Sequence, residues 1–168
     1  LPGDLLITTG PHGLSRLGLA LLTKDPLITQ EQLPETLKRQ AIRTHQRPTP
    51  KLEALRVIEN CKPKHLPWRA AATDSSDGLL NAVNNLCRSS KCQGILKKQS
   101  LPRDNEWPQG AQWDEWCLNG GEDYEMVLSM PEIWAREFIR KIPYAKQIGY
   151  MQQGQYKVSW ENGDEIEN

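Results

Sequence analysis

Short apolar runs that end in Gly, Pro or Asp alternate along this chain with longer segments whose apolar residues recur at helical spacing. Residues 4–9 form one short run, which is closed by Gly10 and Pro11. Residues 79–87, in contrast, place apolar side chains at i, i+1, i+4, i+7 and i+8, as an amphipathic helix does. This alternation predicts an α/β (α+β) fold, a mixed sheet with helices packed on it.

The predicted strands are 4–9, 70–73, 94–96, 126–130, 147–150 and 155–160, and the predicted helices are 14–22, 35–43, 51–60, 79–87 and 131–141. Residues 97–114 are polar and contain proline, so we expect a long surface loop there. Asn162-Gly163 is a strong hairpin-turn signal, with 164–166 as a short partner strand. No internal repeat is visible, and we predict one domain over residues 1–168.

Charge and hydropathy exclude several classes of protein. The chain has 168 residues, with 21 Lys and Arg balanced by 21 Asp and Glu. Binding to nucleic acid or to an acidic membrane surface normally requires a basic face, so we expect neither partner. No apolar run approaches the roughly 20 residues that span a bilayer, and the start lacks the features of a signal peptide. We therefore expect a soluble, cytoplasmic protein; because it does not begin with Met, we expect it to be a piece of a longer one.

Cysteine and histidine give little indication of a site. Among the four cysteines only Cys87 and Cys92 are close, at a C-x4-C spacing with no nearby His, which is a weak zinc signal. We predict reduced, partly buried thiols and assign no metal to sulfur. His12, His45 and His65 are scattered, and we predict core or solvated histidines.

The first acidic cluster, DSSDGL at residues 74–79, lies between a predicted strand and a predicted helix. The N-terminus of a helix has unpaired N–H groups and a partial positive charge, which attract phosphate. Asp74 and Asp77 supply the oxygen ligands that Mg²⁺ prefers, and the Ser76 hydroxyl can contact phosphate oxygens. The alternative is simple capping of the helix by Ser75, Ser76 or Asp77.

The second acidic cluster, GGEDYE at residues 120–125, brings Glu122, Asp123 and Glu125 within four positions. Their mutual repulsion requires compensation by a metal, a cationic ligand group or hydrogen-bond donors. The preceding glycines allow a sharp turn and close approach of a ligand. The alternative is a tight turn into the next strand with solvated acids.

Together the two clusters resemble the D-x-S-D-G-L and G-G-E-D-Y-E-L motifs of thiamine-monophosphate kinase, in family order. Residues 3–20 are similar to the stretch that opens the second domain of that family, and RPTPKL at 47–52 resembles its R-P-x-P-R-L. The resemblance implies the superfamily of aminoimidazole ribonucleotide synthetase and selenophosphate synthetase. Their enzymes join an N-terminal ATP-binding domain to a C-terminal α/β domain, and this chain resembles only the second.

The resemblance also implies a reaction and roles for residues. The kinase transfers the γ-phosphoryl group of ATP to thiamine monophosphate, with Mg²⁺, to give thiamine diphosphate, and its full-length members are expected to be homodimers. By motif position, Asp74 and Asp77 would bind Mg²⁺, Ser76 would contact ATP, and Glu122 would contact the cationic thiamine substrate. No residue is assigned a catalytic role, because phosphoryl transfer needs no protein nucleophile.

Departures from the family pattern limit what this chain is expected to do alone. The N-terminal ATP-binding domain, an arginine before Gly3 and a C-terminal aromatic substrate contact have no match, and Ser75 stands where the family usually has an aliphatic residue. We expect the isolated chain to have little or no kinase activity. Alternatives are another ATP-dependent member, of the selenophosphate synthetase or hydrogenase maturation type, or a non-catalytic ligand-binding or dimerisation module.

Overall fold

The computed structural model describes residues 1–28 and 31–166. In chain order its elements are β1 (Leu5–Thr8), α1 (Leu14–Thr23), η1 (Pro26–Ile28), α2 (Glu35–Gln46), α3 (Glu53–Cys61), β2 (Ala71–Asp74), α4 (Leu79–Ser90), β3 (Gln93–Leu96), η2 (Lys98–Ser100), α5 (Ala111–Asn119), β4 (Met126–Met130), α6 (Glu132–Lys141), β5 (Lys146–Gln152) and β6 (Val158–Trp160).

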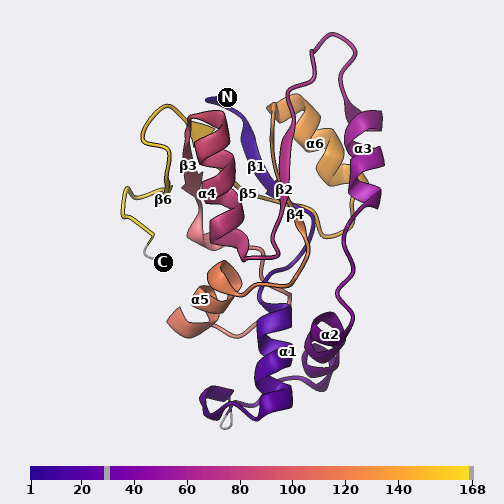
Figure 1. Cartoon of the computed structure of the whole chain (residues 1–168), viewed down its shortest axis with the longest axis vertical. Helices are drawn as coiled ribbons and strands as arrows, with labels where there is room; N and C mark the ends of the chain where they lie inside the picture. The colour runs from indigo at the N-terminus through magenta and orange to yellow at the C-terminus, as the bar shows by residue number, and fades with distance from the viewer. Residues whose placement is uncertain (29–30, 167–168) are drawn as a thin grey trace.

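The described strands form one mixed sheet in the order β2-β4-β1-β5-β3-β6 (Figure 1). The pairs β2–β4, β4–β1, β1–β5 and β5–β3 are antiparallel, whereas β3 and β6 are parallel. The predicted mixed sheet with packed helices is therefore confirmed. Among the described residues, no helix combines the length and the apolar composition that crossing a bilayer requires.

Helices cover both faces of the sheet because successive strand side chains point to opposite sides. In β1, Leu6 belongs to the core under α4, whereas its neighbour Ile7 belongs to the core under α3 and α6. Trp134 of α6 is fully buried there and donates its indole N–H to the carbonyl of Ile58 in α3, at 2.9 Å. Each buried aromatic side chain of this size contributes a few kcal/mol to stability.

A third core lies beyond one end of the sheet, where α1, α2 and α5 meet (Figure 1). Gly18 permits this packing, because a Cβ there would lie 2.2 Å from the carbonyl oxygen of Ala41 in α2. Trp107, Trp113 and Trp116 fill the same core.

The expected surface loop over residues 97–114 is the main error of the sequence prediction. Helix α5 begins at Ala111, η2 lies within the segment, and Trp107 and Trp113 are each only 4% exposed. The polar residues between the tryptophans led to the surface-loop prediction, but Trp107 and Trp113 are buried against helices that are distant in sequence. The strand predicted over 155–160 is shortened to β6, and the turn at Asn162-Gly163 leads to a single bridge between Ser159 and Glu165.

Candidate active site

The two acidic clusters lie side by side at one end of the sheet. Strand β2 ends at Asp74, which pairs with Met126 at the start of β4. The N–H of Ser75 donates to the carbonyl of Glu125 at 2.9 Å, and the N–H of Glu122 donates to the carbonyl of Ser76 at 2.8 Å. Gly121 allows this approach, since a Cβ there would lie 2.6 Å from the Ser76 oxygen. Residues separated by nearly fifty positions thus form one surface.

In the first cluster the side chains of Asp74 and Asp77 are exposed. The hydroxyl and the N–H of Ser76 both donate to Asp74 Oδ1, at 2.6 and 3.0 Å. These two hydrogen bonds hold the pKa of Asp74 below its usual range, so its carboxylate is ionised at neutral pH. The capping alternative is not what the structure has: the N-cap of α4 is Gly78, and no side chain makes a capping hydrogen bond there.

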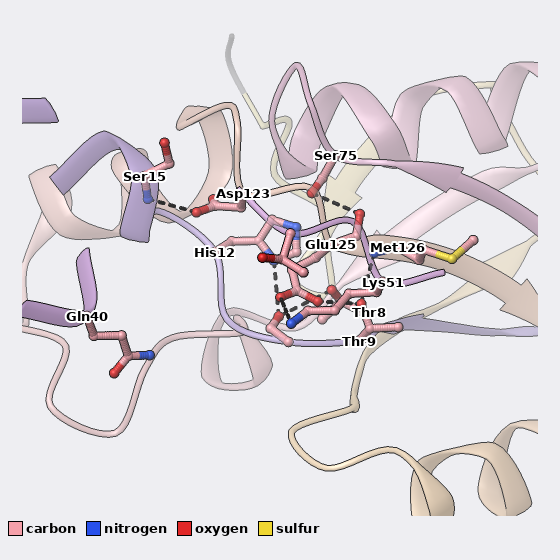
Figure 2. A network of polar contacts seen from close by, with 12 residues as sticks. Thr8, Thr9, His12, Ser15, Gln40, Lys51, Ser75, Asp123, Glu125 and Met126 are labelled. Atoms are coloured by element: carbon pink, nitrogen blue, oxygen red, sulfur yellow. Dashed lines mark hydrogen bonds and ion pairs between the residues drawn. The ribbon is translucent and has the colours of Figure 1, made fainter. Parts of the chain in front are cut away.

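Ser75 is fully buried and points into the protein. Its hydroxyl donates to the carbonyl of Glu125 at 3.1 Å, which adds a second link between the clusters (Figure 2). The departure of this chain from the aliphatic residue of the family is therefore accommodated by a hydrogen bond inside the fold.

In the second cluster, Glu122 alone of the three carboxylates reaches solvent, with 63% of its side chain exposed. Its backbone has φ 66°, in the left-handed region that residues other than glycine rarely adopt. One carboxylate oxygen of Glu122 lies 3.8 Å from Nδ1 of His45 in α2, and that nitrogen lies 3.1 Å from the Ser15 hydroxyl.

Asp123 is buried and faces α1 instead of the solvent. One carboxylate oxygen accepts a hydrogen bond from the N–H of Ser15 at 2.9 Å (Figure 2). The other accepts one from the N–H of Gly13 at 2.6 Å. These N–H groups at the start of α1 have no partner within the helix, so Asp123 caps the helix from 110 residues further along the chain. Burial raises the pKa of Asp123 to about 7, and the two N–H donors oppose the rise.

Glu125 is also buried, beside Thr9 and Lys51 (Figure 2). It accepts a hydrogen bond from the Thr9 hydroxyl and lies 3.5 Å from the Lys51 ammonium group. Burial raises the pKa of Glu125, and Thr9 and Lys51 oppose that rise. The expected repulsion among the three carboxylates is thus relieved by hydrogen-bond donors and a lysine, and the alternative of solvated acids fails for Asp123 and Glu125.

A cavity of about 710 Å³ has Asp123 and Glu125 in its lining. Its walls come from α2, the segment after it, and the loop before β5; they include Arg43, Arg47 and Lys51. None of the predicted site residues Asp74, Ser76, Asp77 and Glu122 lines it. Sequence reasoning did not identify this cavity, although the arginines recur every four residues from position 39 to 47.

The donor set for a metal is small. Among the described residues, no group of three or more His, Cys, Asp or Glu side chains is placed to hold an ion. Asp74 and Asp77 are nevertheless exposed oxygen donors, and Mg²⁺ is commonly held by one or two carboxylates together with water and substrate phosphates. The residues present fit such a partly open site. All four cysteines are free thiols, and they are buried where partial burial was predicted.

Comparison with known proteins identifies the family. The model of the AIR synthase related protein, C-terminal domain, matches residues 2–161. The chain belongs to this family.

Several relatives of the chain are thiamine-monophosphate kinases. The chain is 51% identical to a thiamine-monophosphate kinase of Prochlorococcus marinus over 166 residues, which cover 99% of the chain and 50% of the relative. It is 36% identical to that of Synechococcus elongatus, covering 87% of the chain and 43% of the relative. The chain thus spans about half the length of the curated relatives that it matches.

Solved structures agree with this assignment. AaThiL complexed with AMPPCP and TMP is 28% identical, with a TM-score of 0.75, and covers 100% of the chain and 50% of that protein. The thiamine monophosphate kinase of Aquifex aeolicus is 27% identical, with a TM-score of 0.76, over 100% of the chain and 52% of that protein. HypE of E. coli, at 16% identity and a TM-score of 0.66 over 95% of the chain and 47% of that protein, shares the fold.

Proposed function

We propose that this chain is the C-terminal domain of a thiamine-monophosphate kinase, which transfers the γ-phosphoryl group of ATP to thiamine monophosphate. The observation that carries the proposal is the union of the two acidic clusters into one surface through the bond from Glu122 N to Ser76 O. It is supported by relatives of that name and by a solved neighbour bound to AMPPCP and TMP. The proposal includes Mg²⁺, a cytoplasmic location and a homodimeric full-length enzyme.

Within this proposal each exposed group has a role. Asp74 and Asp77 would hold Mg²⁺, which supplies positive charge to the phosphoryl group being transferred. The Ser76 hydroxyl would contact ATP. Glu122 would contact thiamine monophosphate, because its exposed carboxylate attracts the cationic thiazolium ring. Asp123 and Glu125 hold the backbone of Glu122 in position through α1, Thr9 and Lys51.

The proposal is tested in a chimera that joins the N-terminal half of the Prochlorococcus marinus relative to this chain. We expect the chimera to make thiamine diphosphate from ATP and thiamine monophosphate. Glu122→Gln should raise KM for thiamine monophosphate at least tenfold, and Asp74→Asn with Asp77→Asn should lower kcat at least a hundredfold. Asp164→Asn, in the exposed turn before Glu165, is the matched control and should leave both constants within twofold. A folded but inactive chimera, or variants that behave like this control, would contradict the proposal.

A further inference from the structure

Helix α2 and its C-cap carry three arginines, Arg39, Arg43 and Arg47, which we call the arginine row. A spacing of four residues places them on one side of the helix. All three are exposed, and none forms an ion pair with a described carboxylate; Arg39 donates to the carbonyl of Glu35. Like charges at this spacing destabilise a helix slightly, and an anion bound to the row would relieve that repulsion.

The arginine row borders concave surface. Arg43 and Arg47 line the cavity of about 710 Å³, along with the hydroxyl-bearing side chains of Thr44 and Thr49. A second hollow of about 370 Å³ is lined by all three arginines with Ile42 and Gln46. The larger volume lies in the range typical of small-molecule sites.

The larger cavity also has carboxylates in its lining, but none of these described carboxylates forms an ion pair with the arginine row. Asp123 accepts from the start of α1, and Glu125 lies against Thr9 and Lys51. On the loop before α5, Asp104 accepts from Gln40 at 3.1 Å and Glu106 accepts from Thr36. Glu53, the remaining carboxylate of the lining, is exposed.

We propose that the cavity of about 710 Å³ binds a phosphate-bearing small molecule through Arg43 and Arg47. Arg39, which lines the neighbouring hollow, adds positive charge at the edge of the cavity. A guanidinium group offers paired N–H donors that match two phosphate oxygens, and the threonine hydroxyls can satisfy others. The cavity adjoins the site assigned above at Asp123 and Glu125, but Asp74, Ser76, Asp77 and Glu122 do not line it. The inference therefore does not depend on the kinase assignment.

Titration calorimetry with pyrophosphate, in metal-free buffer containing EDTA at low ionic strength, tests the proposal on the whole chain. We expect saturable binding of one pyrophosphate. Arg43→Gln combined with Arg47→Gln should weaken it at least tenfold, and the corresponding lysine substitutions should weaken it less, because they keep charge but lose the paired donors. Arg56→Gln, which removes an exposed arginine of α3 outside the cavity lining, is the matched control and should change affinity less than twofold.

Two further measurements separate this site from its alternatives. The double variant Asp74→Asn with Asp77→Asn should bind pyrophosphate as the unaltered chain does. If this double variant lost binding while the arginine variants kept it, the inference would be overturned. An equal loss in Arg56→Gln would show non-specific attraction to charge and would also overturn it, as would absence of saturable binding to the unaltered chain. Tighter binding of an acidic peptide than of pyrophosphate would assign the row to a protein partner. Circular dichroism of each variant confirms that it is folded.

Discussion

Asp123 shows how one residue of a ligand-type motif serves the fold. Its neighbour Glu122 is exposed, whereas Asp123 is buried and accepts hydrogen bonds from two N–H groups at the start of α1. Glu125, two residues further on, is buried against Lys51. The positive φ angles of Glu122 and Tyr124 change the direction of the backbone at these two residues. Successive side chains of the cluster therefore point in different directions. Acidic residues that adjoin in sequence therefore have different environments.

Asp123→Asn should destabilise the chain by about 2 kcal/mol, because the amide places a donor where a second N–H acceptor is needed and leaves one buried N–H unpaired. Urea unfolding at pH 8, where Asp123 is ionised, measures the change. The control Asp77→Asn alters an exposed carboxylate and should stay within about 0.5 kcal/mol. Equal stability of the two variants would refute the capping role of Asp123.

His12 predicts a pH dependence of stability. The residue is completely buried, its Nε2 has no hydrogen-bond partner among the described residues, and burial lowers its pKa to about 4 while the Gly10 carbonyl opposes the shift. An unfolded histidine takes up its proton near pH 6.5, so between about pH 6.5 and pH 4 the unfolded state binds more protons. This contribution to stability is therefore present above pH 6.5 and is lost as pH falls.

His12→Leu removes that contribution. Between pH 7 and pH 4 the variant should lose about 3 kcal/mol less of its free energy of unfolding than the unaltered chain does. Chemical denaturation at several pH values compares the two, and the buried carboxylates, being common to both, cancel in the difference. Parallel pH profiles would show that His12 takes up its proton at the same pH in the folded and unfolded states, and would contradict the lowered pKa.

At the scale of elements, the helices α1 and α2 contact the second acidic cluster and position it. Asp123 caps α1, Ser15 of α1 contacts His45 of α2, and His45 approaches Glu122. The series of contacts thus begins at Asp123 and ends at the adjacent residue Glu122. The orientation of Glu122 consequently depends on how closely the two helices pack.

Gly18→Ala should separate α1 from α2, since the added Cβ would lie 2.2 Å from the Ala41 carbonyl oxygen and backbone atoms must move. The free energy of unfolding should fall by about 2 kcal/mol. The higher helix propensity of alanine offsets part of the cost of moving the backbone. For a chain of this size the loss of stability corresponds to a fall in Tm of roughly 6 °C, measured by calorimetry. Leu19→Ala, at a half-exposed position next to it, should cost less than about 1 kcal/mol. A melting temperature unchanged in Gly18→Ala would contradict this packing.

At the scale of the whole molecule, the chain combines well-packed apolar cores with an acidic surface that has few metal ligands. Three apolar clusters lie on the two faces and at one end of the sheet. The two exposed aspartates lack further protein ligands among the described residues. Phosphoryl transfer depends on holding two substrates in line, which a surface of this kind does not achieve alone.

The chain by itself should therefore form thiamine diphosphate at less than about 1% of the rate of a full-length relative, because proximity and charge neutralisation account for much of such catalysis. A coupled assay with equal molar amounts of the chain and of the Prochlorococcus marinus enzyme makes the comparison. Addition of the separate N-terminal half of that enzyme is the informative control. Comparable rates without it would show that this chain holds a complete active site.

The sequence by itself determined the α/β class, most elements and the juxtaposition of turn residues with carboxylates, because hydrophobic periodicity and turn chemistry are local properties. It failed at α5, whose tryptophans are buried only by packing against α1 and α2. Tertiary structure alone decided which acids face solvent. It also decided that Asp123 caps a helix 110 residues away, and that the arginine row borders a cavity. Such outcomes depend on which distant backbone groups approach each side chain, and no local pattern encodes that approach.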